Sequence, residues 1–360
     1  MDQGADTYSE WIGKTCKEDG IEYETWRVAG GTESTATQVQ NLVERANHLE
    51  NAHGILVYYP LYNKPYVLGM TTTANAGHGH GYGYEYEHGH GQQWSIQQQQ
   101  TNIENGCEEI LIRNKAKLPG MTYKTKDDYF RDSISASRDV EGHNHNRRKF
   151  RNQNTYVDRC KHDDDLDSSK EQDQLLPCTA LAVVRVLKRC LEAFDPRKPV
   201  GKRFEGVTVT IINRSEILGR PLASLLANDG ATVYSVDADS IILYKPNGRM
   251  NRCTGDTKSV QSCVEESSVI VTGVPSSTFK IPSHWIQPYS TVINVASEPN
   301  VDEDELREIP GCRYIPQIGK VTVALLEHNL VQLHRRFHSK DDKQNGMLSS
   351  WFSLLRSRKG

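Results

Sequence analysis

Residues 207–237, VTVTIINRSEILGRPLASLLANDGATVYSVD, give the clearest indication of the fold. It opens with an apolar strand at 207–212, and after a polar turn a helix covers 222–230. The helix closes on a glycine, and a second strand at 232–237 ends in an acid, Asp237. A strand, a turn, a helix, a second strand and an acid in this order form the layout of a dinucleotide-binding βαβ unit.

The turn between the first strand and the helix departs from the glycine-rich pattern GxGxxG. Asn213 stands at the first glycine position, and Gly219 keeps the glycine role. Because asparagine tolerates the left-handed backbone conformation better than most residues, a tight turn is still expected. Arg214 and Arg220 flank the helix N-terminus, where their charge would suit an anionic pyrophosphate. The spacing alone leaves both a nucleotide-binding turn and an ordinary strand-to-helix turn open.

The rest of the chain alternates strand-like and helix-like segments. Strand-like runs lie at 23–28, 54–61, 268–275 and 291–296, and helix-like spacing is found at 9–19, 35–50, 175–194 and 321–337. The run GILVYYPL at 54–61 is typical of a strand that is buried on both faces of a parallel sheet. This alternation predicts an α/β protein.

The composition argues against several function classes. A chain of 360 residues has room for two domains, and 43 basic against 46 acidic residues give no charge excess for nucleic acid. No apolar run is long enough for a membrane span, and the first residues lack a secretory signal, so we expect a cytoplasmic protein. The eight cysteines show no metal-ligand spacing and are expected to be reduced thiols without disulfides.

The segment from about 64 to 122 does not follow the α/β pattern. Its centre, TTTANAGHGHGYGYEYEHGHGQQWSIQQQQ at 71–100, offers almost no side chains that a core could bury. We therefore predict a disordered insert. Its four histidines, at positions 78, 80, 88 and 90, lack a scaffold, so no specific metal site is expected.

Several motifs in one order resemble the methylenetetrahydrofolate dehydrogenase family, and they are most similar to its monofunctional NAD-dependent fungal branch. Besides 207–237, they are DVEGHN at 139–144, LLPCTALAVV at 175–184, VTGVPS at 271–276 and YIPQIGKVTVALL at 314–326. The resemblance implies two α/β domains around a cleft, with folate bound mainly by the first and the nicotinamide cofactor by the second. The first would cover 1–194 and be completed by the helix 321–337, the second, Rossmann-like domain would cover 195–320, and 338–360 would form a tail.

The resemblance also assigns the candidate site residues. Tyr8 would stack on the folate, and Asp139 and Glu141 would hold the pterin, since carboxylates accept hydrogen bonds from its N–H groups. Four further positions would contact the substrate: Tyr58, Pro177, Cys178 and Thr179. The cofactor would be held by Asn213, Arg214, Ser215, Gly219, Arg220, Asp237, Thr272, Gly273, Val274, Pro275, Gly319 and Thr322.

The implied reaction is the oxidation of 5,10-methylenetetrahydrofolate to the methenyl compound, in one-carbon metabolism that supplies purine synthesis. The bridging carbon lies between two nitrogens whose lone pairs can expel hydride, so positioning does most of the catalysis. Asp237 favours NAD over NADP, because a carboxylate accepts hydrogen bonds from ribose hydroxyls and repels a 2′-phosphate. Relatives are dimers, so we expect a homodimer.

Two departures bear on the activity. The lysine of the family's YxxxK motif is Ile12 here, and the glutamine of its VQLP strand is Tyr58. An aliphatic side chain cannot support hydrolysis of the methenyl product, and Lys14 lies on another face of the helix, so we expect no cyclohydrolase activity. A bifunctional dehydrogenase/cyclohydrolase is the first alternative. A non-catalytic binding module is the second, because the family places a helix and an inner strand before the Tyr8 motif, and this sequence is expected to lack them.

Overall fold

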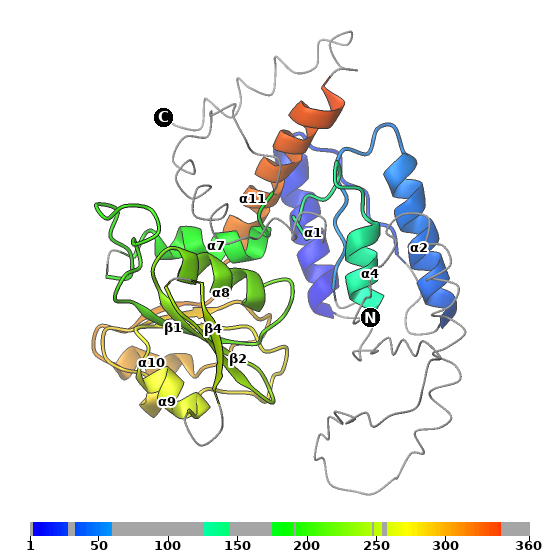
Figure 1. Ribbon diagram of the computed structural model, residues 1–360. Coiled ribbons are helices and arrows are strands. Elements are labelled where there is room, and N and C mark those ends of the chain that lie inside the picture. Colours follow the sequence, from blue (N-terminus) through cyan, green and yellow to red (C-terminus); the bar gives the residue numbers. More distant parts are fainter. Residues whose placement is uncertain are drawn as a thin grey trace, which may run out of the picture. The chain divides into compact units, whose positions relative to one another are not determined.

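The structure is a computed structural model that describes residues 3–27, 33–59, 126–143, 175–190, 192–246, 248–253 and 258–339 (Figure 1). The chain forms two compact units. The first comprises residues 1–26, 45–56 and 134–360, and the second comprises 27–44 and 57–133. The predicted insert at 64–122 lies outside the described residues, as does nearly all of the predicted tail.

A seven-stranded sheet forms the centre of the first unit. Its strands are β1 (Thr208–Ile212), β2 (Thr232–Val236), β3 (Ile241–Tyr244), β4 (Met250–Cys253), β5 (Val269–Thr272), β6 (Thr291–Asn294) and β7 (Arg313–Ile315). The order is β4-β3-β2-β1-β5-β6-β7. The five adjacent strands β2, β1, β5, β6 and β7 are parallel to one another. Strands β3 and β4 pair antiparallel at one edge, an addition that the sequence pattern did not indicate.

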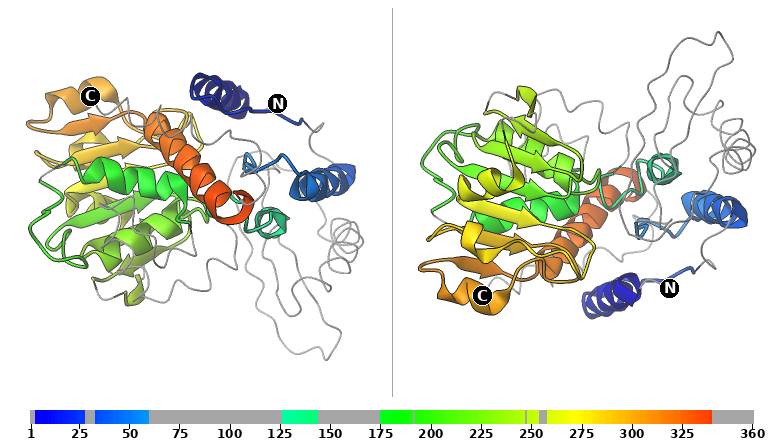
Figure 2. Two further views of the ribbon diagram at one scale, coloured as in Figure 1. Left: turned by 90° about the horizontal axis from the view of Figure 1, so that it is seen from above. Right: turned by 90° about the horizontal axis from the view of Figure 1, so that it is seen from below.

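Helices cover both faces of this sheet. They are α7 (Cys178–Leu187), α8 (Gly219–Asn228), α9 (Val260–Glu265) and α10 (Glu303–Glu308), with a short 3-10 turn η1 (Ser283–Trp285). Figure 1 shows α7 and α8 on one face and α9 and α10 on the other, and the two views of Figure 2 agree. The buried clusters follow the same division, because one joins α7 and α8 to the sheet and the other includes side chains of α9, η1 and α10.

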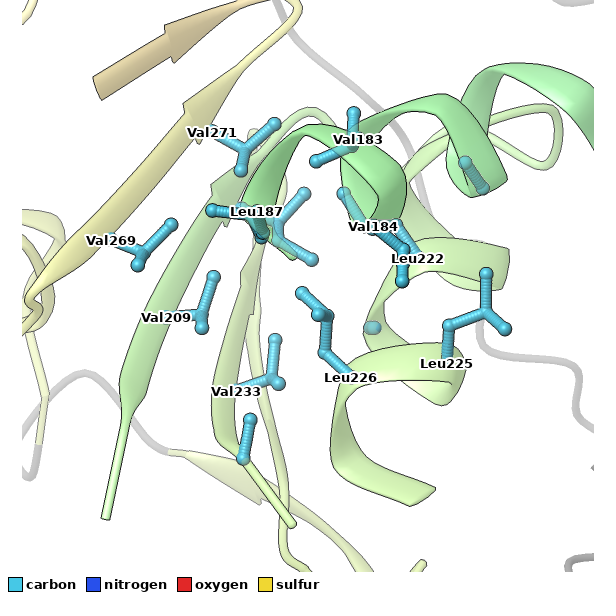
Figure 3. Close-up of a cluster of buried hydrophobic side chains, with 14 of the residues drawn as sticks. Val183, Val184, Leu187, Val209, Leu222, Leu225, Leu226, Val233, Val269 and Val271 are labelled. Atoms are coloured by element: carbon cyan, nitrogen blue, oxygen red, sulfur yellow. The ribbon is translucent and has the colours of Figure 1, made fainter. Parts of the chain in front are cut away.

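The cluster under α7 and α8 is built from branched aliphatic side chains. The sheet contributes Val209, Val233, Val269 and Val271, and the helices contribute Val183, Val184, Leu187, Leu222, Leu225 and Leu226 (Figure 3). Burial of each such side chain contributes about 1.5–3 kcal/mol. Helix α7, which precedes residue 194, shares this core with α8 and the sheet. The predicted division of the chain at residue 194 into a folate domain and a cofactor domain stays a prediction.

Two longer helices of the same unit are α1 (Gln3–Glu18) and α11 (Gly319–Leu333), which a π-helical turn η2 (His334–His338) extends. They are in contact with each other. Burial raises the pKa of the Cys16 thiol of α1 to about 12, with the carboxylate of Glu327 in α11 as the next cause. On α11, Leu326 and Leu333 form a small buried cluster with Val140 and Leu175. The acidic motif at 139–143 is thereby fixed on α11.

Two predicted strands are wrong among the described residues. Residues 23–27 form no strand, because Tyr23 lies against α1, where its hydroxyl is 3.3 Å from Ser9 Oγ. The run at 54–59 contributes only an isolated bridge between Ile55 and Asp139. An apolar run becomes a strand only where a neighbouring strand offers a ladder, and here the backbone beside Ile55 belongs to the turn at 138–139.

Other predicted elements are confirmed with shifted ends. The helix predicted at 9–19 is α1, the helix at 35–50 is α2 (Glu33–His48), and the helix at 175–194 ends at Leu187. In the second unit, α4 (Lys126–Ser133) carries a buried ion pair between Asp128 and Arg131. Within the described parts of the chain, no helix is long and apolar enough to cross a bilayer.

Candidate active site

The parallel strands diverge between β1 and β5, because the chain runs from β1 to β2 on one side and returns to β5 on the other. Ligands of open α/β sheets bind at such a point, outside the carboxyl ends of the strands. Asn213 follows β1 there and has φ +92°, which confirms the predicted left-handed turn. Its side-chain Nδ2 donates to the Gly273 carbonyl after β5 at 2.5 Å, so one residue joins the two diverging loops.

Gly219 begins α8 and packs against the backbone of this turn. A Cβ atom at this position would lie 2.2 Å from the Asn213 carbonyl oxygen and 2.8 Å from the Arg214 Cα. Both neighbours are backbone atoms, so no side-chain rotation can relieve the contact. Gly219 therefore allows the turn and the first residues of the helix to pack in contact, which is what a phosphate-binding turn requires.

The polar side chains of the turn have local partners. Ser215 Oγ accepts from the backbone N–H groups of Leu218 and Gly219, at 3.2 and 3.4 Å. The Arg220 guanidinium pairs with Glu216 at 2.7 Å, and both side chains are about one-third exposed. Arg220 thus stands at the helix N-terminus as predicted, with its charge balanced by a neighbouring acid.

The predicted position of the Arg214 side chain is wrong. The prediction places it beside Arg220 at the helix N-terminus, but the side chain is buried and extends toward the end of β2. There the guanidinium donates to the hydroxyls and the carbonyls of Ser235 and Ser240. These acceptors are 21 and 26 residues away in the sequence, so the local pattern could not indicate them.

Asp237 follows β2, next to the point reached by Arg214. Its side chain is 43% exposed, and its Oδ2 lies 3.9 Å from Arg214 Nη1. The backbone N–H of Asp237 donates to the Ser240 carbonyl at 2.9 Å, which closes the turn at 237–240. An exposed carboxylate at the end of the second strand is the group that accepts hydrogen bonds from an adenosine ribose, so the turn, Gly219 and Asp237 fit a dinucleotide.

Two buried asparagines, missed in the sequence, hold the loops after β5 and β6. Asn300 Oδ1 accepts from the Thr272 hydroxyl at 2.8 Å and from the Val274 N–H at 2.9 Å. The Asn300 N–H in turn donates to Asn294 Oδ1, and Asn294 Nδ2 donates to the Ala296 carbonyl at 2.9 Å. The conformation of the predicted cofactor loop at 272–275 therefore depends on an asparagine side chain outside the loop. The sequence offers one sign of this pair, because Asn294 ends the apolar run of β6.

Four of the predicted folate residues lie together at the start of α7: Tyr8, Asp139, Glu141 and Cys178. Cys178 donates its backbone N–H to the Glu141 carbonyl at 3.2 Å, and Asp139 Oδ1 accepts from Gly142 at 3.0 Å. Burial raises the pKa of the Tyr8 hydroxyl, and the adjacent Cys178 and Glu141 raise it further. Burial likewise raises the pKa of the Cys178 thiol, with Glu141 as the next cause. At neutral pH the tyrosine and the cysteine are therefore both protonated.

The acidic motif is held in one conformation. Gly142 has φ +71°, and a Cβ there would lie 2.7 Å from the Leu176 carbonyl oxygen. Asn329 of α11 donates to the Val140 carbonyl at 2.8 Å, and His143 Nε2 lies 3.6 Å from Glu141 Oε1. The motif is therefore a fixed, buried turn.

The remaining predicted residues lie around these groups. Pro177 precedes the first residue of α7, and Thr179 is in its first turn. Thr322 is buried in α11 and donates its hydroxyl to the Ile318 carbonyl at 3.3 Å. Gly319 begins α11, and a Cβ there would lie 3.5 Å from the Trp11 ring and 4.0 Å from the Tyr8 ring. The start of α11 on the cofactor side thus adjoins the tyrosine of the folate side.

Ile12 and Tyr58 are the two departures from the resemblance. Ile12 is fully buried in α1 and carries no charge. Lys14, two residues later in the same helix, is exposed. Tyr58 is half-buried and belongs to the second unit. Its predicted contact with the substrate stays a prediction.

No group of three or more histidine, cysteine or acidic side chains within the described ranges is arranged to hold a metal ion. The cysteines in those ranges are free thiols: Cys16, Cys178, Cys190, Cys253, Cys263 and Cys312. The histidine-rich tract at 78–90 lies outside the described residues.

Comparisons with known proteins agree with this geometry. The family model "Tetrahydrofolate dehydrogenase/cyclohydrolase, catalytic domain" matches residues 1–70, and the NAD(P)-binding domain of the same family matches 177–338. A methylenetetrahydrofolate dehydrogenase [NAD(+)] of Dictyostelium discoideum is 31% identical over 92% of this chain and 82% of the relative. The Schizosaccharomyces pombe protein of the same name is also 31% identical, over 92% of this chain and 81% of its own length.

Solved structures give the same result. The NAD-dependent 5,10-methylenetetrahydrofolate dehydrogenase of Saccharomyces cerevisiae superposes with a TM-score of 0.62 and 27% identity, over 93% of this chain and 84% of that chain. A dehydrogenase-cyclohydrolase of Trypanosoma brucei, with a TM-score of 0.53 and 18% identity, covers the same shares and shares the fold.

Proposed function

Because the chain belongs to the tetrahydrofolate dehydrogenase/cyclohydrolase family, we propose that it oxidises 5,10-methylenetetrahydrofolate to 5,10-methenyltetrahydrofolate with NAD. Two relatives whose sequences match 92% of this chain are named as NAD-dependent dehydrogenases, whereas the sequence of a bifunctional FolD protein of Roseobacter denitrificans matches 45% of it. The observation that carries the proposal is how near Gly319 lies to Tyr8, since a Cβ at Gly319 would be 4.0 Å from the Tyr8 ring. Gly319 begins α11 and is a predicted cofactor residue, whereas Tyr8 is a predicted folate residue.

The site supplies positioning and needs no base. The turn at 213–219 and the loop at 272–275 would hold NAD at the carboxyl ends of β1 and β5, where its nicotinamide would supply the hydride acceptor. The substrate carbon lies between two nitrogens whose lone pairs expel that hydride, so no proton has to be removed. This agrees with the protonated states of Tyr8 and Cys178 at neutral pH. Tyr8 would present a ring to the pterin, and Glu141 would offer an acceptor for its N–H groups. Asp139 is only 1% exposed and accepts the Gly142 N–H, so it holds the turn that carries Glu141.

The first prediction tests this role of Tyr8. The wild-type protein is expected to form NADH from methylenetetrahydrofolate, and Tyr8→Ala is expected to lower kcat/KM by about 10- to 100-fold, because stacking on an aromatic ring contributes about 1–3 kcal/mol. Tyr8→Phe keeps the ring and should stay within about threefold of wild type on the same principle. Absorbance of NADH measures all three proteins.

Tyr289→Ala is the control, since Tyr289 is 75% exposed and lies outside the site. This variant should retain wild-type activity. A folded wild-type protein that forms no NADH with this substrate would disprove the proposed function. A Tyr8→Ala variant as active as wild type would remove only the role of the ring.

We also propose that the protein has no cyclohydrolase activity. Ile12 is fully buried and cannot transfer a proton or stabilise an oxyanion beside the methenyl carbon. Hydrolysis of methenyltetrahydrofolate is therefore expected to run at the uncatalysed rate in a preparation that is active as a dehydrogenase. Loss of the methenyl absorbance with and without protein measures this, and a rate that rises with protein concentration would contradict it.

Three further parts of the proposal concern context. The chain would work as a homodimer in the cytoplasm and supply one-carbon units to purine synthesis. The family resemblance supports the dimer. Light scattering of the purified protein tests the dimer, and fractionation of the source cells tests the location.

A further inference from the structure

The buried guanidinium of Arg214 raises a question of cofactor choice. An arginine near the end of the second strand accommodates the 2′-phosphate of NADP in many dinucleotide-binding folds, whereas an acid there selects NAD. This chain carries both, since Asp237 Oδ2 lies 3.9 Å from Arg214 Nη1. The selectivity then depends on what restrains the arginine.

The hydrogen bonds of Arg214 account for nearly all of its donors. Nε donates to Ser235 Oγ at 3.2 Å, and Nη2 donates to the Ser235 and Ser240 carbonyls, each at 2.6 Å. Nη1 donates to Ser240 Oγ at 2.9 Å. A guanidinium has five N–H donors, so one remains, on the Nη1 nitrogen that lies nearest Asp237.

The surroundings keep the side chain in this position. Only 4% of the Arg214 side chain is exposed, whereas 43% of the Asp237 side chain is. Burial lowers the pKa of Arg214 and the neighbouring Asp237 opposes that shift, so the guanidinium stays charged. The Ser240 hydroxyl also donates to Asp239 Oδ1 at 3.1 Å, which fixes it within the turn.

We propose that Ser235 and Ser240 determine cofactor specificity by holding Arg214 against the end of β2, where it cannot turn toward a 2′-phosphate. We call this pair the serine latch. The inference rests on the proposed function. It assigns Arg214 a positioning role, because the guanidinium orders the Asp237 turn and leaves the exposed carboxylate to meet the adenosine ribose.

The latch predicts a gain of NADP use when it is opened. Ser240→Ala removes the acceptor of Nη1 and frees that nitrogen for an anion. The ratio of kcat/KM for NADP to that for NAD is expected to rise about tenfold, since a hydrogen bond to a charged group is worth about that factor. Ser240→Thr keeps the hydroxyl and should keep the wild-type ratio.

The gain must depend on the arginine. Adding Arg214→Ala to Ser240→Ala should return the ratio to the wild-type value, because no guanidinium is left to contact the phosphate. Ser224→Ala serves as the matched control, since the Ser224 hydroxyl donates only to the Arg220 carbonyl within α8. That variant should leave both cofactors unaffected.

Dissociation constants for NAD and NADP, measured by protein fluorescence without folate, accompany the kinetics. A parallel loss of affinity for both cofactors in Ser240→Ala, or a gain of NADP affinity that persists without Arg214, would overturn the latch alone. A wild-type protein that binds NAD but does not oxidise methylenetetrahydrofolate would overturn the proposed reaction and leave the latch to be judged by binding. If neither dinucleotide bound, both would fall.

Discussion

Gly219→Ala is expected to lower kcat/KM for NAD by at least about a hundredfold, because displacing a positioned group by about 1 Å costs about that factor. The new Cβ would lie 2.2 Å from the Asn213 carbonyl oxygen, so the turn or the helix must move. Movement of the turn would also strain the bond from Asn213 Nδ2 to the Gly273 carbonyl. Overpacking of this kind lowers stability by about 1–3 kcal/mol.

Gly206→Ala is the matched control for this change. A Cβ at Gly206 meets nothing within 4 Å, although its φ of +90° disfavours a side chain. It should therefore lose some stability and keep wild-type NAD kinetics. NADH formation and NAD binding measure both variants. Gly219→Ala with a KM and kcat for NAD close to those of wild type would show that the turn does not approach the cofactor.

Arg203→Ala is expected to destabilise the first unit by about 3–5 kcal/mol, because it leaves a buried carboxylate without its cation. Arg203 and Asp229 are each about 5% exposed, and Nη2 lies 2.7 Å from Oδ2. The carboxylate also accepts from the Gly201 N–H at 2.8 Å, so it ties the segment before β1 to the turn before β2. Denaturant unfolding followed by circular dichroism measures the loss.

The exposed pair of Arg197 and Asp195 supplies the control for Arg203. The Arg197 side chain is 87% exposed, and its loss should leave the unfolding midpoint unchanged. Replacing both members of the buried pair, Arg203→Met with Asp229→Leu, should recover part of the stability. Recovery is incomplete because the Gly201 N–H then lacks its acceptor. Equal midpoints for wild type and Arg203→Ala would contradict the prediction.

Features of the candidate site that depend on neighbouring residues in the sequence could be predicted, whereas those that depend on distant residues could not. Asn213 adopts the left-handed conformation expected from its residue type and place in the turn. The direction of the Arg214 side chain was predicted wrongly, because acceptors on β2 and its following turn compete with the helix N-terminus for the same donors. Asn294 and Asn300 were missed because their partners lie in three different loops.

The βαβ unit at 207–237 could be predicted without coordinates, since strand, turn and helix preferences act over a few residues and all agree there. The resemblance to the family's YxxxK motif also placed Ile12 at the lysine position, because comparing a motif needs no coordinates. By contrast, the single bridge that the run at 54–59 forms with Asp139 became visible only in the three-dimensional structure. The same holds for the meeting of Tyr8, Glu141 and Cys178. The physical reason is that sheet pairing, burial and side-chain hydrogen bonds depend on which distant segments supply the partners.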